Sequence, residues 1–159
     1  MLNYSREQLV DLGAEITTRE IHQQPQVWQA AFDAYRAHQT EIEAFIDSID
    51  GKYDYVKVIF TGAGTSAYVG DTLIPYLRSI YDERKWNFNS IATTDIVANP
   101  LTHLRKDVPT VLVSFARSGN SPESVATVDL AKQLVDELYQ VTITCAAEGK
   151  LAQQAHGDE

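Results

Sequence analysis

The chain has 159 residues, of which 44% are hydrophobic, and this suits one domain of ordinary size with its own core. Thirteen Lys and Arg against 22 Asp and Glu leave a net charge of −9, which disfavours a generic binder of nucleic acids or of anionic membranes. Eight glycines and five prolines are too few for a low-complexity chain. An anionic ligand must therefore be held by local dipoles and hydroxyl groups.

The single cysteine, Cys145, excludes an intrachain disulfide and a metal site built from several cysteines. It stands in an apolar run, which favours a buried, inert thiol over a nucleophile. The N-terminus shows no basic segment followed by an apolar stretch, and no run of about 18 apolar residues occurs. The sequence predicts a soluble, cytoplasmic protein with no membrane or nucleic-acid partner, no metal and no cofactor.

Residues 1–51 are predicted to form an N-terminal helical segment. Apolar residues of 5–22 fall on one side of a helix, and Gln24-Pro25 is predicted to break it, because proline suits the first turn of a new helix. From Val27 to Ile49 the apolar residues recur every three or four positions, which indicates an amphipathic helix that ends at Asp50-Gly51. This apolar stripe is interpreted as packing surface.

The hydrophobic period changes after this segment. Strands are predicted over 55–60, 110–115 and 140–145, with a weaker one over 89–94, and helices over 69–81, 121–138 and 148–156. Alternating strands and helices imply a parallel sheet with helices on both faces. The predicted fold class is α/β, a three-layer α/β/α arrangement with a flavodoxin-like sheet in the order 2-1-3-4. The segment 140–145 is expected to be an unpaired edge.

Two loops that follow predicted strands have the composition of a binding site. One is Gly62-Ala63-Gly64-Thr65-Ser66, and the other is Arg117-Ser118-Gly119-Asn120-Ser121-Pro122-Glu123. In an open α/β sheet, ligands bind beyond the carboxyl ends of the strands, where the strand order reverses. Both loops should therefore converge on one cavity, with two helix N-termini aimed into it. Such termini together with serine hydroxyls suit a phosphate monoester.

The composition of the two loops is also compatible with helix capping or with nucleotide binding. Ser, Asn and Gly are normal helix caps, and Asn120 with Glu123 has the spacing of a capping box. A Walker A loop is excluded, because Gly64 is not followed by its pattern. The first loop matches the loosened dinucleotide motif G-x-G-x-x-[GA]. The acidic residue that should hold a ribose about 20 residues later, at the end of the second strand, has no clear candidate, because Asp95 is more than 30 residues on. A small phosphorylated ligand accounts for both loops together.

The two loops resemble those of the sugar isomerase (SIS) domain. That family has a strand–GxGTS–helix unit and, further along, a strand–x-[ST]-x-S-G-x-[ST]–helix unit. The resemblance implies that Ser66, Ser118 and Ser121 are hydroxyl ligands of a sugar phosphate and that Arg117 and backbone amides complete the grip. Ala116 departs from the pattern, at a position where a hydroxyl residue is common. The implied site consists of Gly64, Thr65, Ser66, Arg117, Ser118, Gly119, Asn120 and Ser121.

A second resemblance lies upstream of the first loop. The run Glu20-Ile21-His22-Gln23-Gln24-Pro25 is similar to the E-I-x-x-Q-P signature before the isomerase half of glucosamine-6-phosphate synthase-like proteins. With the second loop it points to tagatose-6-phosphate ketose/aldose isomerase-like proteins, also described as galactosamine-6-phosphate deaminase/isomerases. These carry two SIS domains in tandem. The resemblance implies that residues 52–159 are the first SIS domain, truncated before its last strand, and that the protein is a homo-oligomer.

The implied function is isomerisation or deamination of an amino-sugar or ketohexose phosphate. Such chemistry needs a base beside C2 of the sugar, and the phosphate serves as the anchor. Capping accounts for Glu123, and the histidines are interpreted as surface or packing residues: His22, His38, His103 and His156. No catalytic residue is named, and the resemblance implies that the base comes from the second domain.

The alternative function is a non-catalytic module of a regulator that senses a sugar phosphate, because SIS domains also serve in that role. Such a regulator would carry a basic DNA-binding segment. The N-terminal segment is not basic and shows no helix-turn-helix pattern. The sequence therefore favours the enzyme.

Overall fold

The computed structural model describes residues 4–155. The chain divides into two compact units, Met1–Lys52 and Tyr53–Glu159. The first unit contains two helices, α1 (Arg6–Asp11) and α2 (Glu15–Asp50). A capping box begins α1: the Ser5 hydroxyl accepts from the Gln8 N–H, and the Gln8 side chain accepts from the Ser5 N–H.

The predicted break at Pro25 is wrong. Helix α2 continues through Pro25, because a proline removes one backbone hydrogen bond while the bonds on either side keep the helix in one piece. The interruption lies at Gly13 instead, whose φ of +65° is a left-handed conformation that glycine adopts without strain. The predicted end at Asp50-Gly51 is confirmed. Several large apolar side chains of α2 are exposed, so their role as packing surface stays a prediction: Val27, Trp28, Phe32, Tyr35, Ile42 and Ile46.

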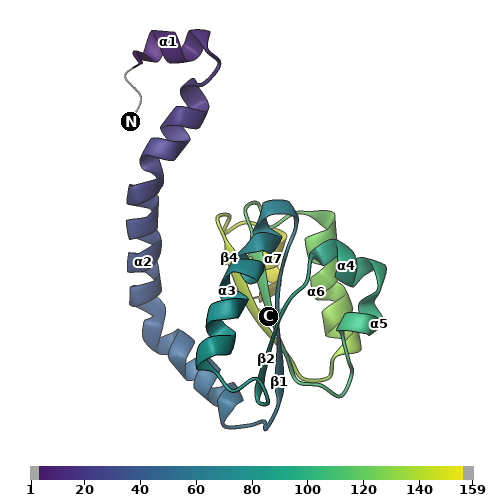
Figure 1. Cartoon of the computed structure of the whole chain (residues 1–159). Helices are drawn as coiled ribbons and strands as arrows, with labels where there is room; N and C mark the ends of the chain where they lie inside the picture. Colours follow the sequence, from purple (N-terminus) through teal and green to yellow (C-terminus); the bar gives the residue numbers. More distant parts are fainter. Residues whose placement is uncertain (1–3, 156–159) are drawn as a thin grey trace. The chain divides into compact units, whose positions relative to one another are not determined.

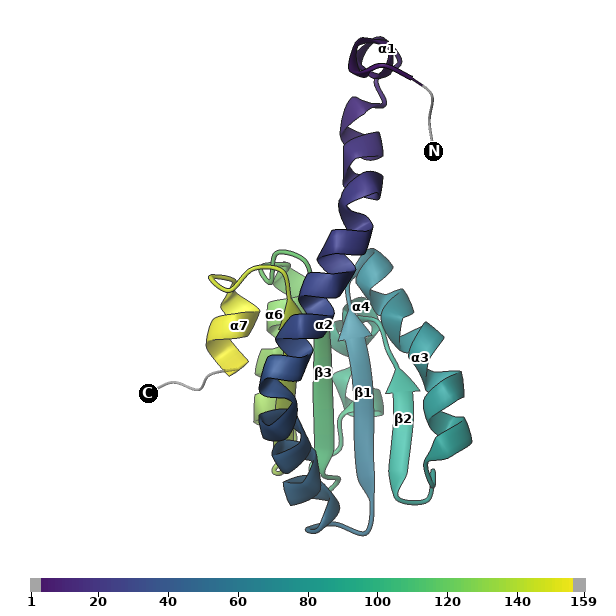
Figure 2. The ribbon, with the colours of Figure 1, turned by 90° about the vertical axis from the view of Figure 1, so that its left-hand side faces the viewer.

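The second unit contains a four-stranded sheet of β1 (Val56–Gly62), β2 (Trp86–Ser90), β3 (Thr110–Ala116) and β4 (Leu138–Thr144). All neighbouring strands are parallel, and their order is β2-β1-β3-β4. The predicted order is therefore confirmed. Figure 2 shows β3, β1 and β2 side by side, with β1 central. Among the described strands, β4 pairs only with β3, as expected for an edge.

Helices cover both faces of this sheet, which confirms the three-layer prediction (Figure 1). Helix α3 (Ala67–Ile80) follows a short 3₁₀ turn and packs on β1 and β2. The opposite face carries α4 (Thr93–Ala98), α5 (Pro100–His103), α6 (Pro122–Leu134) and α7 (Lys150–Ala155). No helix within residues 4–155 has the length and apolar character needed to cross a membrane.

The main core lies between the sheet and the helices of the second face. It consists of Ile59 and Leu112 of the central strands with Ile96, Leu104, Val128, Ala131, Val135 and Leu151. On the other face, Phe60 stacks with Phe88 and Phe115, and Gly70 brings α3 close, since a Cβ there would lie 2.7 Å from the Cβ of Phe60. Partial burial, with a contribution from Arg105, lowers the pKa of Lys57, whose ammonium donates to the His103 carbonyl.

Several element boundaries differ from the predictions. The weak strand is β2, which ends at Ser90, and residues from Thr93 form a helix that the sequence did not predict. The buried residues Trp86 and Phe88 alternate with polar Asn87 and Asn89, so the strand lies earlier than its apolar composition indicates.

The last part of the sheet also departs from prediction. Helix α6 ends at Leu134, because Val135 is extended and the chain enters β4 at Leu138. His103 is the last residue of α5, a short helix that the sequence did not predict. The prediction of a buried thiol is wrong, because Cys145 lies one residue beyond β4 and is exposed.

Candidate functional site

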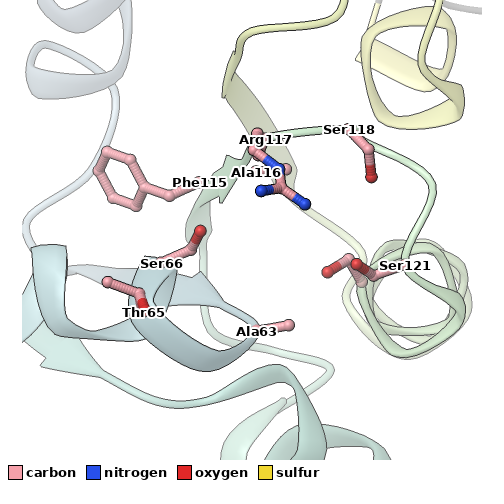
Figure 3. A pocket seen from close by; sticks show the side chains of 9 residues that line it. Ala63, Thr65, Ser66, Phe115, Ala116, Arg117, Ser118 and Ser121 are labelled. Carbon is pink, nitrogen blue, oxygen red and sulfur yellow. The ribbon is translucent and has the colours of Figure 1, made fainter. Parts of the chain in front are cut away.

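A cavity of about 320 Å³ opens at the carboxyl ends of β1 and β3, between the two hydroxyl-rich loops (Figure 3). This volume is at the lower end of the range for small-molecule sites. Figure 3 shows Ser66 of the first loop across from Ser118 and Ser121 of the second, with the Arg117 side chain between them. The cavity is lined by Ala63, Thr65, Ser66, Phe115, Ala116, Arg117, Ser118, Ser121 and Ser124.

The first wall of the cavity is the turn after β1. Gly64 has a φ of +57°, which begins the 3₁₀ turn Gly64–Ser66. Gly62 allows this turn to fold back over the strand end, because a Cβ on Gly62 would lie 2.7 Å from the Cβ of Ser66. Ser66 is thereby held half-buried at the start of α3, on the cavity side.

The second wall is the loop after β3 together with the first turn of α6. The Ser118 hydroxyl accepts from the Asn120 N–H at 3.3 Å, so its own proton is free for a ligand. Ser121 is half-buried at the N-cap of α6, and Ser124 is buried one turn later. Arg117 is exposed and forms no ion pair with any residue in the part of the chain that the structure describes.

Helix capping does not occupy the serines of the two loops. Ser66 and Ser121 stand at the N-cap positions of α3 and α6, yet neither side chain bonds to its helix. The capping box of Asn120 and Glu123 is absent as well. Asn120 Oδ1 instead accepts from the Lys150 N–H at 3.1 Å, at the start of α7. Both N-cap hydroxyls therefore remain available to a ligand.

The second loop is anchored to the chain that follows β4. The Gly119 carbonyl accepts from the Leu151 N–H at 3.1 Å, and Thr144 Oγ1 lies 3.4 Å from the Arg117 carbonyl oxygen, to which it donates. A Cβ on Gly149 would lie 2.6 Å from the Ser118 carbonyl oxygen, so the two backbones touch. These contacts hold the backbone of the loop that carries Ser118.

The structure brings together most of the residues predicted from the sequence. Thr65, Ser66, Arg117, Ser118 and Ser121 line the cavity. The other predicted residues do not line it: Gly64 and Gly119 supply left-handed backbone turns, and Asn120 caps α7.

Ser124 lines the cavity but is not among the predicted site residues. It follows Ser121 by three positions, which places both side chains on the same side of α6. That helical spacing is the signal that could have identified it. Ala116 also lines the cavity, so Ser124 adds a hydroxyl to a lining where Ala116 has none.

No carboxylate or imidazole lines the cavity, so its described lining offers no general base. Glu123 and His103 both lie outside this lining. His22 and His38 belong to α2 in the first unit, and His156 lies outside the described residues. Within residues 4–155, no cluster of three or more His, Cys, Asp or Glu could hold a metal ion. The lining instead offers hydroxyl groups and one guanidinium group, which can donate hydrogen bonds.

Sequence comparison places the chain beside deaminases of an amino-sugar phosphate. It is 45% identical over 148 residues to D-galactosamine-6-phosphate deaminase AgaS of Shewanella sp. strain ANA-3. The matched region covers 93% of this chain and 38% of that protein. It is 42% identical over 139 residues to the Escherichia coli protein of the same name, over 87% of this chain and 35% of the other. The chain thus spans well under half the length of these relatives.

Comparison with solved structures finds proteins that act on related sugar phosphates according to their names. Tagatose-6-phosphate ketose/aldose isomerase from Escherichia coli superposes with a TM-score of 0.80 at 39% identity, over 89% of this chain and 37% of that one. A structure from Clostridium novyi NT, provisionally assigned the same enzyme name, gives 0.88 at 41% identity, over 98% of this chain and 38% of that one. Residues 53–158 match the SIS domain, and the chain therefore belongs to the SIS domain family.

Proposed function

We propose that the cavity binds the phosphate group of a hexose or hexosamine 6-phosphate and that the chain contributes this site to a deaminase or isomerase of such sugars. The observation that carries the proposal is the meeting of two hydroxyl-rich loops in one cavity, with both N-cap serines free of capping bonds. The names of the relatives, galactosamine-6-phosphate deaminase and tagatose-6-phosphate ketose/aldose isomerase, support this substrate class.

The groups around the cavity suit a phosphate monoester. Hydroxyl protons are available from Ser66, Ser118, Ser121 and Ser124, and Arg117 adds the one cation of the lining. Helix α6 begins directly after the same loop, and the positive end of its dipole favours an anion by about 0.3–1 kcal/mol at an exposed site. Because the chain carries a net charge of −9, these local groups must supply the attraction.

The reaction needs groups that this cavity lacks. Isomerisation moves a proton between C1 and C2, and deamination passes through a related intermediate, so both require a base beside C2. We assign the chain the role of anchor, in which phosphate binding positions C1 and C2 for a base supplied elsewhere. A second SIS domain or a neighbouring subunit of a homo-oligomer would supply that base.

The proposal is tested by NMR titration of the ¹⁵N-labelled chain with galactosamine 6-phosphate, tagatose 6-phosphate and unphosphorylated galactosamine. The phosphorylated sugars should shift the amide signals of Ser66, Ser118 and Ser121, because these residues line the cavity. Galactosamine should leave the signals in place at the same concentration. If neither sugar phosphate shifts these signals, the proposed function is wrong.

A further inference from the structure

Two buried threonines connect the two loops of the cavity. Thr93 begins α4 and is 1% exposed, and its hydroxyl donates to the Gly62 carbonyl at 3.3 Å. Thr127 of α6 is 0% exposed, and its hydroxyl shares its proton between the Thr93 carbonyl at 3.3 Å and the Glu123 carbonyl at 2.8 Å. The result is a continuous hydrogen-bonded bridge from Gly62 to Glu123.

Each end of this bridge contacts a cavity wall. Gly62 ends β1 and lies directly against Ser66, since a Cβ on it would come within 2.7 Å of the Cβ of Ser66. Glu123 lies in the first turn of α6, between Ser121 and Ser124. The bridge therefore joins the backbone next to Ser66 to the helical turn that carries Ser121 and Ser124.

We propose that Thr93 and Thr127 are positioning residues that set the spacing between the two walls of the phosphate site, an inference that rests on the proposed function. Neither threonine lines the cavity, so neither touches the ligand. A hydrogen bond to a ligand forms only when its donor and acceptor meet at a suitable distance and angle. A phosphate that contacts Ser66 and Ser121 together needs that spacing held, and the bridge fixes it from both sides.

The experiment replaces each hydroxyl by a methyl group of the same shape, in Thr93→Val and Thr127→Val. Thr110→Val is the matched control: Thr110 is 0% exposed and donates to the Val108 carbonyl at 2.9 Å, at the start of β3 and away from the cavity. All three variants lose one hydroxyl group of a buried threonine. Affinity for galactosamine 6-phosphate is measured by calorimetry, and stability by urea unfolding.

The bridge variants should bind about threefold to tenfold more weakly than Thr110→Val at a comparable loss of stability. Thr93→Ser, which keeps the hydroxyl, should restore binding. Without ligand, hydrogen exchange at the Ser66 and Ser124 amides should be faster in the bridge variants than in the control. If Thr93→Val does not fold, Thr127→Val and the exchange measurement decide by the same criteria.

The possible failures separate the two proposals. If the bridge variants bind like Thr110→Val while Ser118→Ala binds more weakly, the phosphate site stands and the positioning role is wrong. If the wild-type chain binds no sugar phosphate, the proposed function fails and the positioning role falls with it.

Discussion

Gly149 does not line the cavity, but its backbone packs directly against the loop that carries Ser118. A Cβ at this position would lie 2.6 Å from the carbonyl oxygen of Ser118 and 3.1 Å from that of Ala146. Both obstacles are backbone atoms, which cannot move aside as the tip of a side chain can. A larger residue must therefore displace the loop that holds Ser118, and Lys150 and Leu151, which bond to the same loop, would move with it.

We predict that Gly149→Ala destabilises the chain by about 1–3 kcal/mol, the usual cost of overpacking, and also weakens sugar-phosphate binding. Gly51→Ala is the control, because the nearest atom to a Cβ there, the Asp47 carbonyl oxygen, is at an ordinary 3.5 Å. Urea unfolding and calorimetry measure the two effects. Equal stability and affinity in the two variants would show that the close contact with Ser118 has no consequence.

Ser124 offers a second prediction at this scale. Its side chain is 4% exposed and lines the cavity, so a ligand hydrogen bond there would be largely shielded from water. Ser124→Ala should weaken galactosamine 6-phosphate binding about tenfold, the effect of one hydrogen bond to a charged group. Calorimetry beside Ser79→Ala provides the comparison, because Ser79 is an exposed serine of α3 whose hydroxyl donates to the Tyr76 carbonyl. Unchanged affinity would exclude Ser124 as a ligand.

At the scale of elements, the sequence predicts the strands that are continuous apolar runs and the glycine-containing loops that follow them. Strands β1 and β3 are such runs, and both end at the loops that form the cavity. The prediction places β2 too late in the sequence, because its buried Trp86 and Phe88 alternate with polar asparagines. Helix α4 escapes prediction because it is a single short helix whose place depends on tertiary bonds from Thr93, which local patterns do not contain.

The edge strand β4 leads to a prediction about association. Among the described strands β4 pairs with β3 alone, and Ile143 on this strand is 53% exposed. Such an edge favours pairing with another chain. Light scattering should show mass rising with concentration for the wild type and less so for Ile143→Lys, because a charged side chain opposes edge pairing.

Ile80→Lys is the control for this test, since Ile80 is 55% exposed at the end of α3 and lies on no strand. It should associate like the wild type. A wild-type chain that stays monomeric at high concentration would contradict the prediction.

For the whole molecule, the sequence predicts the residues of the candidate binding site but not the residues that would carry out a reaction. The loops and their serines follow from local sequence, whereas the exposure of Cys145 depends on how the elements assemble. The continuity of α2 through Pro25 depends on the helical backbone bonds on either side of the proline, which the sequence pattern does not reveal. The cavity-lining residues include no candidate for the base that the proposed reaction needs. That outcome agrees with a chain that spans 38% of the length of its Shewanella relative.

We therefore predict that the 159-residue chain binds galactosamine 6-phosphate but neither deaminates nor isomerises it. Loss of a general base typically lowers the rate by about 10²–10⁴-fold, and a phosphate anchor that binds substrate and transition state equally does not replace it. Ammonia release and ketose formation are measured beside the Escherichia coli deaminase. Comparable turnover would place the base within this chain, and Glu123 and His103 would be the first residues to replace.

The central claim is that the two hydroxyl-rich loops together hold the phosphate, and Ser118→Ala tests it most directly. Ser118 lines the cavity. Its hydroxyl oxygen accepts from the Asn120 N–H, which leaves the hydroxyl proton for a ligand. Calorimetry with galactosamine 6-phosphate should show affinity about tenfold to a hundredfold lower for Ser118→Ala, with Ser79→Ala unchanged and both variants folded. Equal affinity in Ser118→Ala and the wild type would mean that this loop is not the phosphate site.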